Sequence, residues 1–279
     1  MMKLIADSGS TKTDWRLIES GKLLFEFESV GLNPFFNTEN DVKDVLASLD
    51  LIVDNKTNIQ EVYFYGAGCS DETHCQIIYK AFNKLLPNAQ INVEHDLLAA
   101  ARSTCQGEVG IACILGTGSN SCLYDGEKII KNVPALGYIL GDEGSGTDIS
   151  KHFLRAFFYD ELPKNIVDSI TNHHNWNKHD LLEHLYEKSF PNRYLASLTE
   201  IVKKYIDEPF VFELVKSCFN QFLFYHVAKY KGATKYPINF VGSIAFEFKD
   251  ILAEALTQNG MQLGKIIKKP IDELVKYHS

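Results

Sequence analysis

The chain alternates between short apolar runs and polar turns, and this pattern begins at the N-terminus. The apolar run 3–6 is followed by the polar stretch 7–14 and by two further apolar runs, 15–18 and 22–25. Such runs, bounded by Gly, Ser and Asp, predict strands joined by tight turns. Gly9 allows a ligand to approach the backbone, and the neighbouring Ser and Thr residues offer donors. The turn can therefore wrap a phosphate, although an ordinary hairpin explains it equally well.

The same pattern recurs near the middle of the chain. The apolar run 110–115 leads into the Gly/Ser/Thr-rich turn 116–120, which is followed by the apolar run 121–124 and a turn at 125–126. Two strand–polar loop–strand units predict an internally duplicated fold with a nucleotide between its halves.

Between these units the pattern alternates between helical and strand spacing. Apolar residues at helical spacing predict helices over 38–52 and 71–86, and short apolar runs predict strands over 62–65 and 90–93. Asp96 follows the second strand and opens an Ala-rich segment. This is the position of a helix N-cap, and we expect Asp96 to be that cap. The carboxyl end of a strand in an α/β protein is also where ligands bind, and the two roles are compatible.

The second half contains a long helical region. The segment 135–148 is rich in glycine and acidic residues, which favours a loop close to a ligand, and a helix is expected from Ile149. Residues 160–232 have helical spacing throughout, and one continuous helix is expected over 195–206.

The C-terminal part returns to alternating strands and helices. A strand over 237–241 ends in Gly242-Ser243 before a helix over 249–258, and this arrangement predicts a third corner that faces an anion or nucleotide. A last strand over 261–267 and a terminal helix over 271–277 complete the pattern.

Composition and charge narrow the class of protein. With 279 residues, 45% hydrophobic and 23% charged, the chain suits one large or two modest globular domains. Its net charge of −8 argues against a nucleic-acid partner. No apolar run reaches the ~18–20 residues that span a bilayer, and the N-terminus lacks the pattern of a signal peptide. We expect no membrane partner and a cytoplasmic protein. The six cysteines form no C-x-x-C pair, as expected of reduced thiols.

Over nearly its whole length the chain resembles the actin-like ATPase superfamily of sugar kinases and Hsp70. Within it, the chain is similar to the BadF/BadG/BcrA/BcrD branch that contains N-acetylglucosamine kinase. The matching motifs are 7–13, 95–100, 116–120, 141–146 and 241–243. The GTGSN and GDEGS elements together are specific to the branch, whereas the first loop marks only the superfamily.

The resemblance implies an α/β fold of two ribonuclease-H-like domains, each with a mixed sheet flanked by helices, with ATP in the cleft between them. The N-terminal domain would comprise 1–106 together with the C-terminal helix 268–279. The C-terminal domain would comprise 107–267 and include a helical insertion. A homodimer is also consistent with this branch.

The resemblance further implies a kinase that uses ATP and Mg²⁺ to phosphorylate the 6-hydroxyl of an amino sugar, with N-acetylglucosamine as the expected substrate. Asp96 would be the general base, and Asp7 would orient magnesium through water. The residues expected to hold the sugar are Asn33, Asp96, Ser119, Asn120, Ala135, Leu136, Gly137 and Asp142. The residues expected to hold ATP are Ser8, Gly9, Ser10, Thr11, Lys12, Gly116, Thr117, Gly118, Gly242, Ser243 and Phe246.

Two departures from the branch leave the sugar open. Leu136 replaces an expected aromatic residue, and Pro34-Phe35 replaces a His-Trp pair. Glucosamine and N-acetylmuramic acid therefore stay candidate substrates.

Two other functions stay open on the same scaffold. An ATP-driven activator of a 2-hydroxyacyl-CoA dehydratase or benzoyl-CoA reductase would hold an iron–sulfur cluster with cysteines, and the cysteines here lack a cluster spacing. A non-catalytic sugar or nucleotide sensor has no need of a base, so the presence of Asp7, Asp96 and Asp142 together argues against it.

Overall fold

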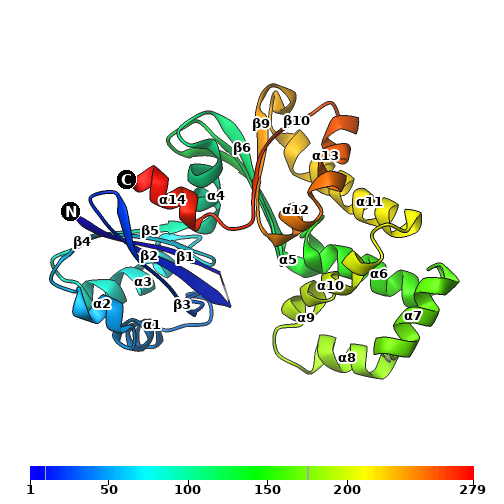
Figure 1. The fold of residues 1–279 in the computed structure, drawn as a ribbon, viewed down its shortest axis with the longest axis horizontal. Coiled ribbons are helices and arrows are strands. Elements are labelled where there is room, and N and C mark those ends of the chain that lie inside the picture. Colours follow the sequence, from blue (N-terminus) through cyan, green and yellow to red (C-terminus); the bar gives the residue numbers. More distant parts are fainter. Residues whose placement is uncertain (10, 175) are drawn as a thin grey trace. The chain divides into compact units, whose positions relative to one another are not determined.

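The computed structural model describes residues 1–9, 11–174 and 176–279 (Figure 1). The chain divides into two units, which we call the N-terminal unit and the C-terminal unit. The N-terminal unit consists of Met1–Glu108, Gly126–Ile129 and Lys269–Ser279. The C-terminal unit consists of Val109–Asp125 and Ile130–Lys268.

The N-terminal unit is built on a mixed five-stranded sheet. Its strands are β1 (Met2–Ser8), β2 (Lys12–Glu19), β3 (Lys22–Val30), β4 (Ile59–Gly66) and β5 (Gln90–His95), in the order β3-β2-β1-β4-β5. The first three strands pair antiparallel, whereas β1, β4 and β5 run parallel. The carboxyl ends of β1, β4 and β5 therefore lie at one edge of the sheet, where ligands bind in α/β proteins.

Helices cover both faces of this sheet (Figure 1). They are α1 (Glu39–Ala47), α2 (Asp50–Asp54), α3 (Glu72–Leu85), α4 (Asp96–Cys105) and α14 (Ile271–His278). Helices α1 and α3 pack together on one face, and α4 and α14 pack together on the other.

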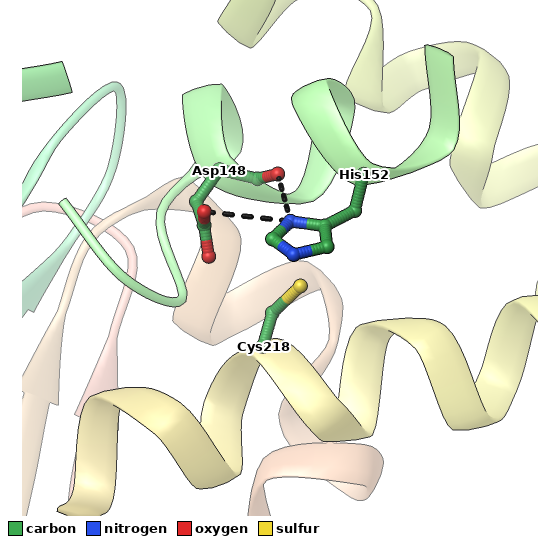
Figure 2. Close-up of side chains that lie close together, drawn as sticks. All are labelled: Asp148, His152 and Cys218. Atoms are coloured by element: carbon green, nitrogen blue, oxygen red, sulfur yellow. Dashed lines mark hydrogen bonds and ion pairs between the residues drawn. The ribbon is translucent and has the colours of Figure 1, made fainter. Parts of the chain in front are cut away.

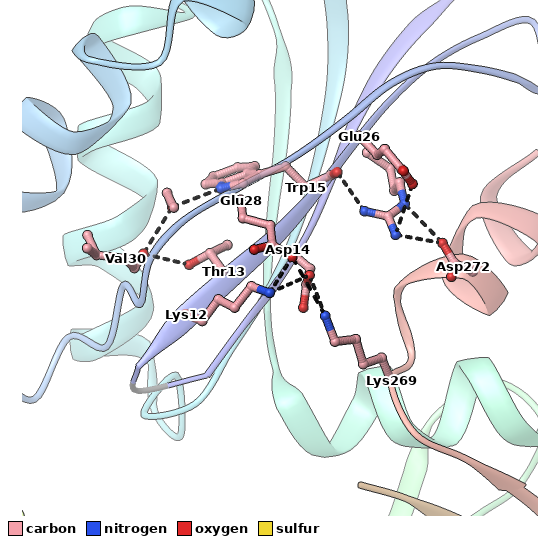
Figure 3. A network of polar contacts seen from close by, with 11 residues as sticks. Lys12, Thr13, Asp14, Trp15, Glu26, Glu28, Val30, Lys269 and Asp272 are labelled. Carbon is pink, nitrogen blue, oxygen red and sulfur yellow. Dashed lines mark hydrogen bonds and ion pairs between the residues drawn. The ribbon is translucent and has the colours of Figure 1, made fainter. Parts of the chain in front are cut away.

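Ion pairs fasten the C-terminal segment to β2 (Figure 3). The ammonium of Lys269 donates to the buried Asp14 carboxylate at 2.8 Å. The guanidinium of Arg16 donates to Asp272, at the start of α14, at 2.9 Å. Lys12 pairs with Glu28 on the neighbouring strand. The last residues of the chain are thus part of the N-terminal unit, and they bring Lys269 to its acidic edge.

The C-terminal unit repeats the sheet of the N-terminal unit. Its strands are β6 (Gly110–Leu115), β7 (Ser119–Tyr124), β8 (Ile129–Val133), β9 (Pro237–Val241) and β10 (Gln262–Ile267), in the order β10-β9-β6-β7-β8. Strand β6 pairs antiparallel with β7 and parallel with β9, as β1 does with β2 and β4. The predicted α/β fold of two mixed sheets flanked by helices is confirmed.

Most helices of the C-terminal unit lie between β8 and β9. These are α5 (Gly137–Leu140), α6 (Gly146–Phe158), α7 (Lys164–His174), α8 (Lys178–Tyr186), α9 (Pro191–Ser197), α10 (Thr199–Lys204), α11 (Pro209–Tyr225) and the short 3₁₀ helices η1 (Val227–Lys229) and η2 (Ala233–Lys235). Helices α12 (Ser243–Glu247) and α13 (Lys249–Gln258) follow β9. Side chains of α6, α11 and α13 form the core against the sheet. Within the described ranges, no helix is long and apolar enough to cross a membrane.

Two helices predicted as continuous are broken in the structure. The segment 38–52 forms α1 and α2, separated at Ser48, whose hydroxyl donates to the Val45 carbonyl at 2.7 Å. The segment 195–206 is likewise divided between α9 and α10 at Leu198. Apolar spacing continues across both breaks, so the pattern alone does not reveal them.

The aromatic core of the N-terminal unit gives a test of its packing. Phe82 is fully buried, and its ring packs edge-on against Trp15 and Phe64 at centroid distances of 6.2 and 5.7 Å. Phe82→Ala should lower the free energy of unfolding by about 3–5 kcal/mol, because it leaves a cavity. Phe25→Ala, at a side chain that is 46% exposed on β3, should change it by less than about 0.5 kcal/mol. Urea denaturation followed by tryptophan fluorescence measures both, and equal losses would contradict this core.

Candidate active site

Two carboxylates lie at the carboxyl edge of the N-terminal sheet. Asp7 is near the end of β1, and Asp96 directly follows β5. Burial, and then the negative charges of Asp96 and Asp14, raise the pKa of Asp7 to about 7, against the opposing charge of Lys269. Carboxylates that crowd in this way fit a hydrated divalent cation, which would relieve their repulsion. The donor set is therefore compatible with magnesium at Asp7.

The predicted N-cap at Asp96 is wrong, because His95 caps α4. The His95 backbone is extended, and its Nδ1 accepts from the Leu97 amide at 2.9 Å. Asp96 is the first helical residue, so its carboxylate is not taken up by the helix end. Its Oδ1 atom is buried, lies 2.7 Å from His95 Nδ1, and has no well-oriented hydrogen bond within the described part of the chain.

Gly9 and Thr11 lie between β1 and β2. The Gly9 amide donates to the Lys12 carbonyl at 2.9 Å, and Gly9 and Thr11 are exposed. The Lys12 ammonium is paired with Glu28, which raises the pKa of Lys12. Ser10, a predicted ATP contact, lies outside the described residues. The exposed backbone of Gly9 and Thr11 is the part of this turn that can meet a phosphate.

Ser8 and Asn33 have structural partners inside the same unit. The buried Ser8 hydroxyl accepts from the Leu32 amide at 2.9 Å, which fixes the loop that carries Asn33. The Asn33 side-chain oxygen accepts from the Phe35 amide at 2.9 Å. A Cβ on Gly68, where φ is +86°, would stand 2.3 Å from that oxygen. Asn33 is therefore held in a turn that requires glycine opposite it.

In the C-terminal unit, Asp142 packs over the loop that follows β6. Its Oδ1 accepts from the Ser119 amide at 3.1 Å, and a Cβ on Gly118 would lie 2.9 Å from its Oδ2. Burial raises the pKa of Asp142, whereas the Ser119 amide lowers it. The Ser119 hydroxyl is buried without a hydrogen-bond partner among the described residues. An unpartnered buried hydroxyl beside a carboxylate fits a ligand that carries hydroxyl groups.

Glycines shape two turns of this unit, the loop after β6 and the turn between β9 and α12. The Gly116 carbonyl accepts from the Gly146 amide at 2.9 Å, which joins the loop to the start of α6, and no atom lies within 4 Å of a Cβ at Gly116. Gly242, between β9 and α12, has φ +125°, and a Cβ there would lie 2.2 Å from the Leu115 carbonyl oxygen. The backbone at Gly116 is therefore open to the close approach of a phosphate, whereas Gly242 is required by the contact with β6.

The remaining predicted residues of this unit occupy different settings. Thr117 accepts from the Thr147 amide at 3.3 Å, and the Asn120 side-chain oxygen accepts from Asn132 at 2.9 Å. Ser243 opens α12, where Phe246 is 41% exposed. The exposed predicted sugar contacts are Ala135, Leu136 and Gly137.

Two polar clusters behind these loops are absent from the sequence prediction. The buried His226 contacts the Glu143 carboxylate at 3.0 Å, although the two residues are far apart in the chain. Figure 2 shows the second cluster, in which Asp148 and His152 on α6 lie beside Cys218 on α11. Burial, together with the charge of Asp148, raises the pKa of the Cys218 thiol well above its usual value. Asp148 Oδ2 also accepts from the Gly144 amide at 3.0 Å, so this cluster supports the loop before α6.

The chain is similar to solved structures of sugar kinases. No family model and no curated protein matches the chain. A solved structure of a proposed N-acetylglucosamine kinase from Porphyromonas gingivalis is 40% identical, with a TM-score of 0.94 over 99% of this chain and 98% of that one. A second such protein, from Chromobacterium violaceum, is 15% identical, with a TM-score of 0.77 over 100% and 99% of the two chains. A ROK hexokinase from Thermus thermophilus shares the fold at 13% identity and a TM-score of 0.53, over 96% and 93%.

The fold and these matches define the class as the actin-like ATPase fold. Within it, the chain belongs to the BadF/BadG/BcrA/BcrD family, in its N-acetylglucosamine kinase-like branch.

Because the pKa of Asp7 is raised in the folded protein, Asp7 should make the free energy of unfolding depend on pH. The folded-state pKa is about 7, above the ordinary 3.8, so the unfolded chain releases this proton first as the pH rises. Asp7 therefore destabilises the fold progressively from about pH 4 to about pH 7. In metal-free buffer, Asp7→Asn should exceed wild type in free energy of unfolding by on the order of 2–4 kcal/mol at about pH 8, and match it below about pH 4. Asp54→Asn, at an exposed position, is the control. A difference that does not vary with pH would contradict this origin.

The fit of Asp142 over Gly118 gives a second test. Gly118→Ala should lower the free energy of unfolding by about 1–3 kcal/mol, because the new methyl group displaces the Asp142 carboxylate. Gly116→Ala meets open space and should change stability by less than about 1 kcal/mol. Thermal unfolding of both variants checks the contact, and equal effects would argue against it.

Proposed function

We propose that this protein is an ATP-dependent sugar kinase that phosphorylates the 6-hydroxyl of N-acetylglucosamine, with Asp96 as the general base. The carrying observation is the Asp96 carboxylate, which is free of helix capping and lies near Asp7 at the carboxyl edge of the sheet. The family of the chain supports the sugar-kinase class, and its 40% identical relative supports the choice of sugar.

The chemistry needs one proton acceptor in the N-terminal unit. In phosphoryl transfer the protein contributes mainly positioning and charge stabilisation. Asp96 would take the proton of the attacking hydroxyl as the oxygen–phosphorus bond forms. Asp7 would orient magnesium through water, and the backbone of Gly9 and of Thr11 would face a phosphate. ATP and Mg²⁺ supply the phosphoryl group and neutralise the charge that develops on it.

The C-terminal unit offers hydrogen-bond donors and acceptors for both ligands. The backbone at Gly116, which has open space beside it, would approach the phosphates of ATP, and Gly118 and Gly242 would border it. The Asp142 carboxylate and the buried Ser119 hydroxyl would bind sugar hydroxyl groups. The exposed Leu136 side chain lacks a polar group, so it contributes no side-chain hydrogen bond to the choice between amino sugars.

The thiols of the N-terminal unit do not favour the activator function. Cys69 is buried, and burial raises the pKa of its thiol far above the ordinary value. The thiol of Cys75 donates to the Cys69 carbonyl, and its pKa is raised as well. Iron–sulfur clusters are held by thiolates, so protonated thiols engaged inside the unit argue for a structural role.

The proposal predicts sugar-dependent turnover that depends on Asp96. Wild type should release ADP from ATP and Mg²⁺ with N-acetylglucosamine, and less efficiently with glucosamine, N-acetylmuramic acid or glucose. Asp96→Asn should lower kcat by about 10²–10⁴-fold, because the general base is lost. Glu94→Gln, which removes a nearby carboxylate on β5, should stay within about twofold of wild type.

Three outcomes separate the candidate functions. Turnover on one amino sugar that is lost in Asp96→Asn supports the kinase. ATP binding without turnover on any sugar of the panel would favour the sensor. A purified protein that carries an iron–sulfur absorption band would favour the activator.

A further inference from the structure

His95 occupies a position in which one ring nitrogen has two neighbours. Its Nδ1 lies 2.9 Å from the Leu97 amide nitrogen and 2.7 Å from Asp96 Oδ1. An unprotonated Nδ1 has one lone pair, and a protonated Nδ1 has one hydrogen. The nitrogen therefore serves only one of the two neighbours at a time.

The two protonation states leave different groups without a partner. When Nδ1 is unprotonated, its lone pair accepts from the Leu97 amide and caps α4. Asp96 Oδ1 then faces the same nitrogen without a proton between them, and this oxygen is buried. When Nδ1 is protonated, it donates to Oδ1, and the Leu97 amide loses its acceptor. A buried, unpaired carboxylate oxygen costs more than one unpaired backbone amide, because the carboxylate carries a charge.

We propose that His95 is a positioning residue for Asp96, whose protonated ring donates Nδ1–H to Oδ1 and leaves Oδ2 to accept the proton of the substrate hydroxyl. When the ring becomes neutral by losing the Nδ1 proton, its remaining proton lies on Nε2, so Nδ1 accepts from the Leu97 amide and no longer fixes the carboxylate. This inference rests on the proposed function, because it assigns a purpose to the orientation of the base.

The charged groups around His95 and Asp96 determine how the activity should depend on pH. Burial lowers the pKa of His95, whereas the contact with Asp96 and its charge raise it, and the net pKa lies above the ordinary 6.5. The charge of Asp96 also acts on Asp7 of β1 and on Cys69 after β4, and Glu94 precedes His95 on β5. His95 is protonated below its raised pKa, so activity should fall on the alkaline side. Asp7 must lose a proton to bind a cation, so it produces the opposite, acidic limb.

His95→Asn separates capping from proton binding. Asparagine is among the best N-cap residues, so this variant keeps the cap of α4 and removes the titrating ring. In wild type, kcat/KM for N-acetylglucosamine should fall about tenfold on the alkaline side, a part of what a general base contributes. In His95→Asn the alkaline limb should disappear, while the acidic limb and the melting temperature stay unchanged. His95→Ala, which loses both functions, should melt earlier.

A measurement without turnover tests the contact itself. Imidazole NMR resonances, assigned to His95 by their loss in His95→Asn, give its pKa in wild type and in Asp96→Asn. The pKa of His95 should fall in Asp96→Asn. An unchanged pKa there, or an alkaline limb that persists in His95→Asn, would overturn the inference. Absence of turnover on every sugar in wild type would reject the proposed function, whereas the NMR result would still decide whether His95 holds Asp96.

Discussion

The crowding of carboxylates at one sheet edge is the constraint on which the N-terminal unit depends. Because β1, β4 and β5 run parallel, their ends bring Asp7 and Asp96 near one another, and the charge of Asp14 adds to the repulsion. Lys269 is the opposing cation, and it reaches this edge because the C-terminal segment is fastened to β2. The end of the chain therefore helps to set the charge of the site. Like Lys269, a cation bound at Asp7 would lower the pKa of Asp7 and reduce the repulsion among the carboxylates.

The C-terminal unit has the same sheet order, but its loops are constrained by close packing around a buried carboxylate. Its loops must lie close to a carboxylate and to neighbouring backbone, so Gly118 and Gly242 stand where a side chain would collide. The buried carboxylate of Asp142 is stabilised by the Ser119 amide. A backbone amide therefore offsets part of the free-energy cost of burying this carboxylate. At Gly116 the loop keeps open space beside the backbone.

The start of α4 links the architecture to the chemistry. A strand that ends at His95 and a helix that begins at Asp96 place a titratable ring directly beside a carboxylate. If Asp96 capped the helix, its oxygen would be committed to a backbone amide and less able to accept a proton. The one-residue shift of the cap therefore leaves the Asp96 carboxylate outside the helix-cap hydrogen bond.

The sequence by itself determined the elements whose signal is local. The strand at 237–241 and the helix at 249–258 have the predicted bounds, because apolar spacing and Gly242 lie within a few residues of them. The repeated turn motifs indicated the internal duplication for the same reason. Only the tertiary structure decided the cap at His95, the ion pair between Lys269 and Asp14, and the contact of Glu143 with His226. Each of these depends on backbone angles or on residues that are distant in the chain, so the raised pKa of Asp7 could not be deduced from the order of the residues.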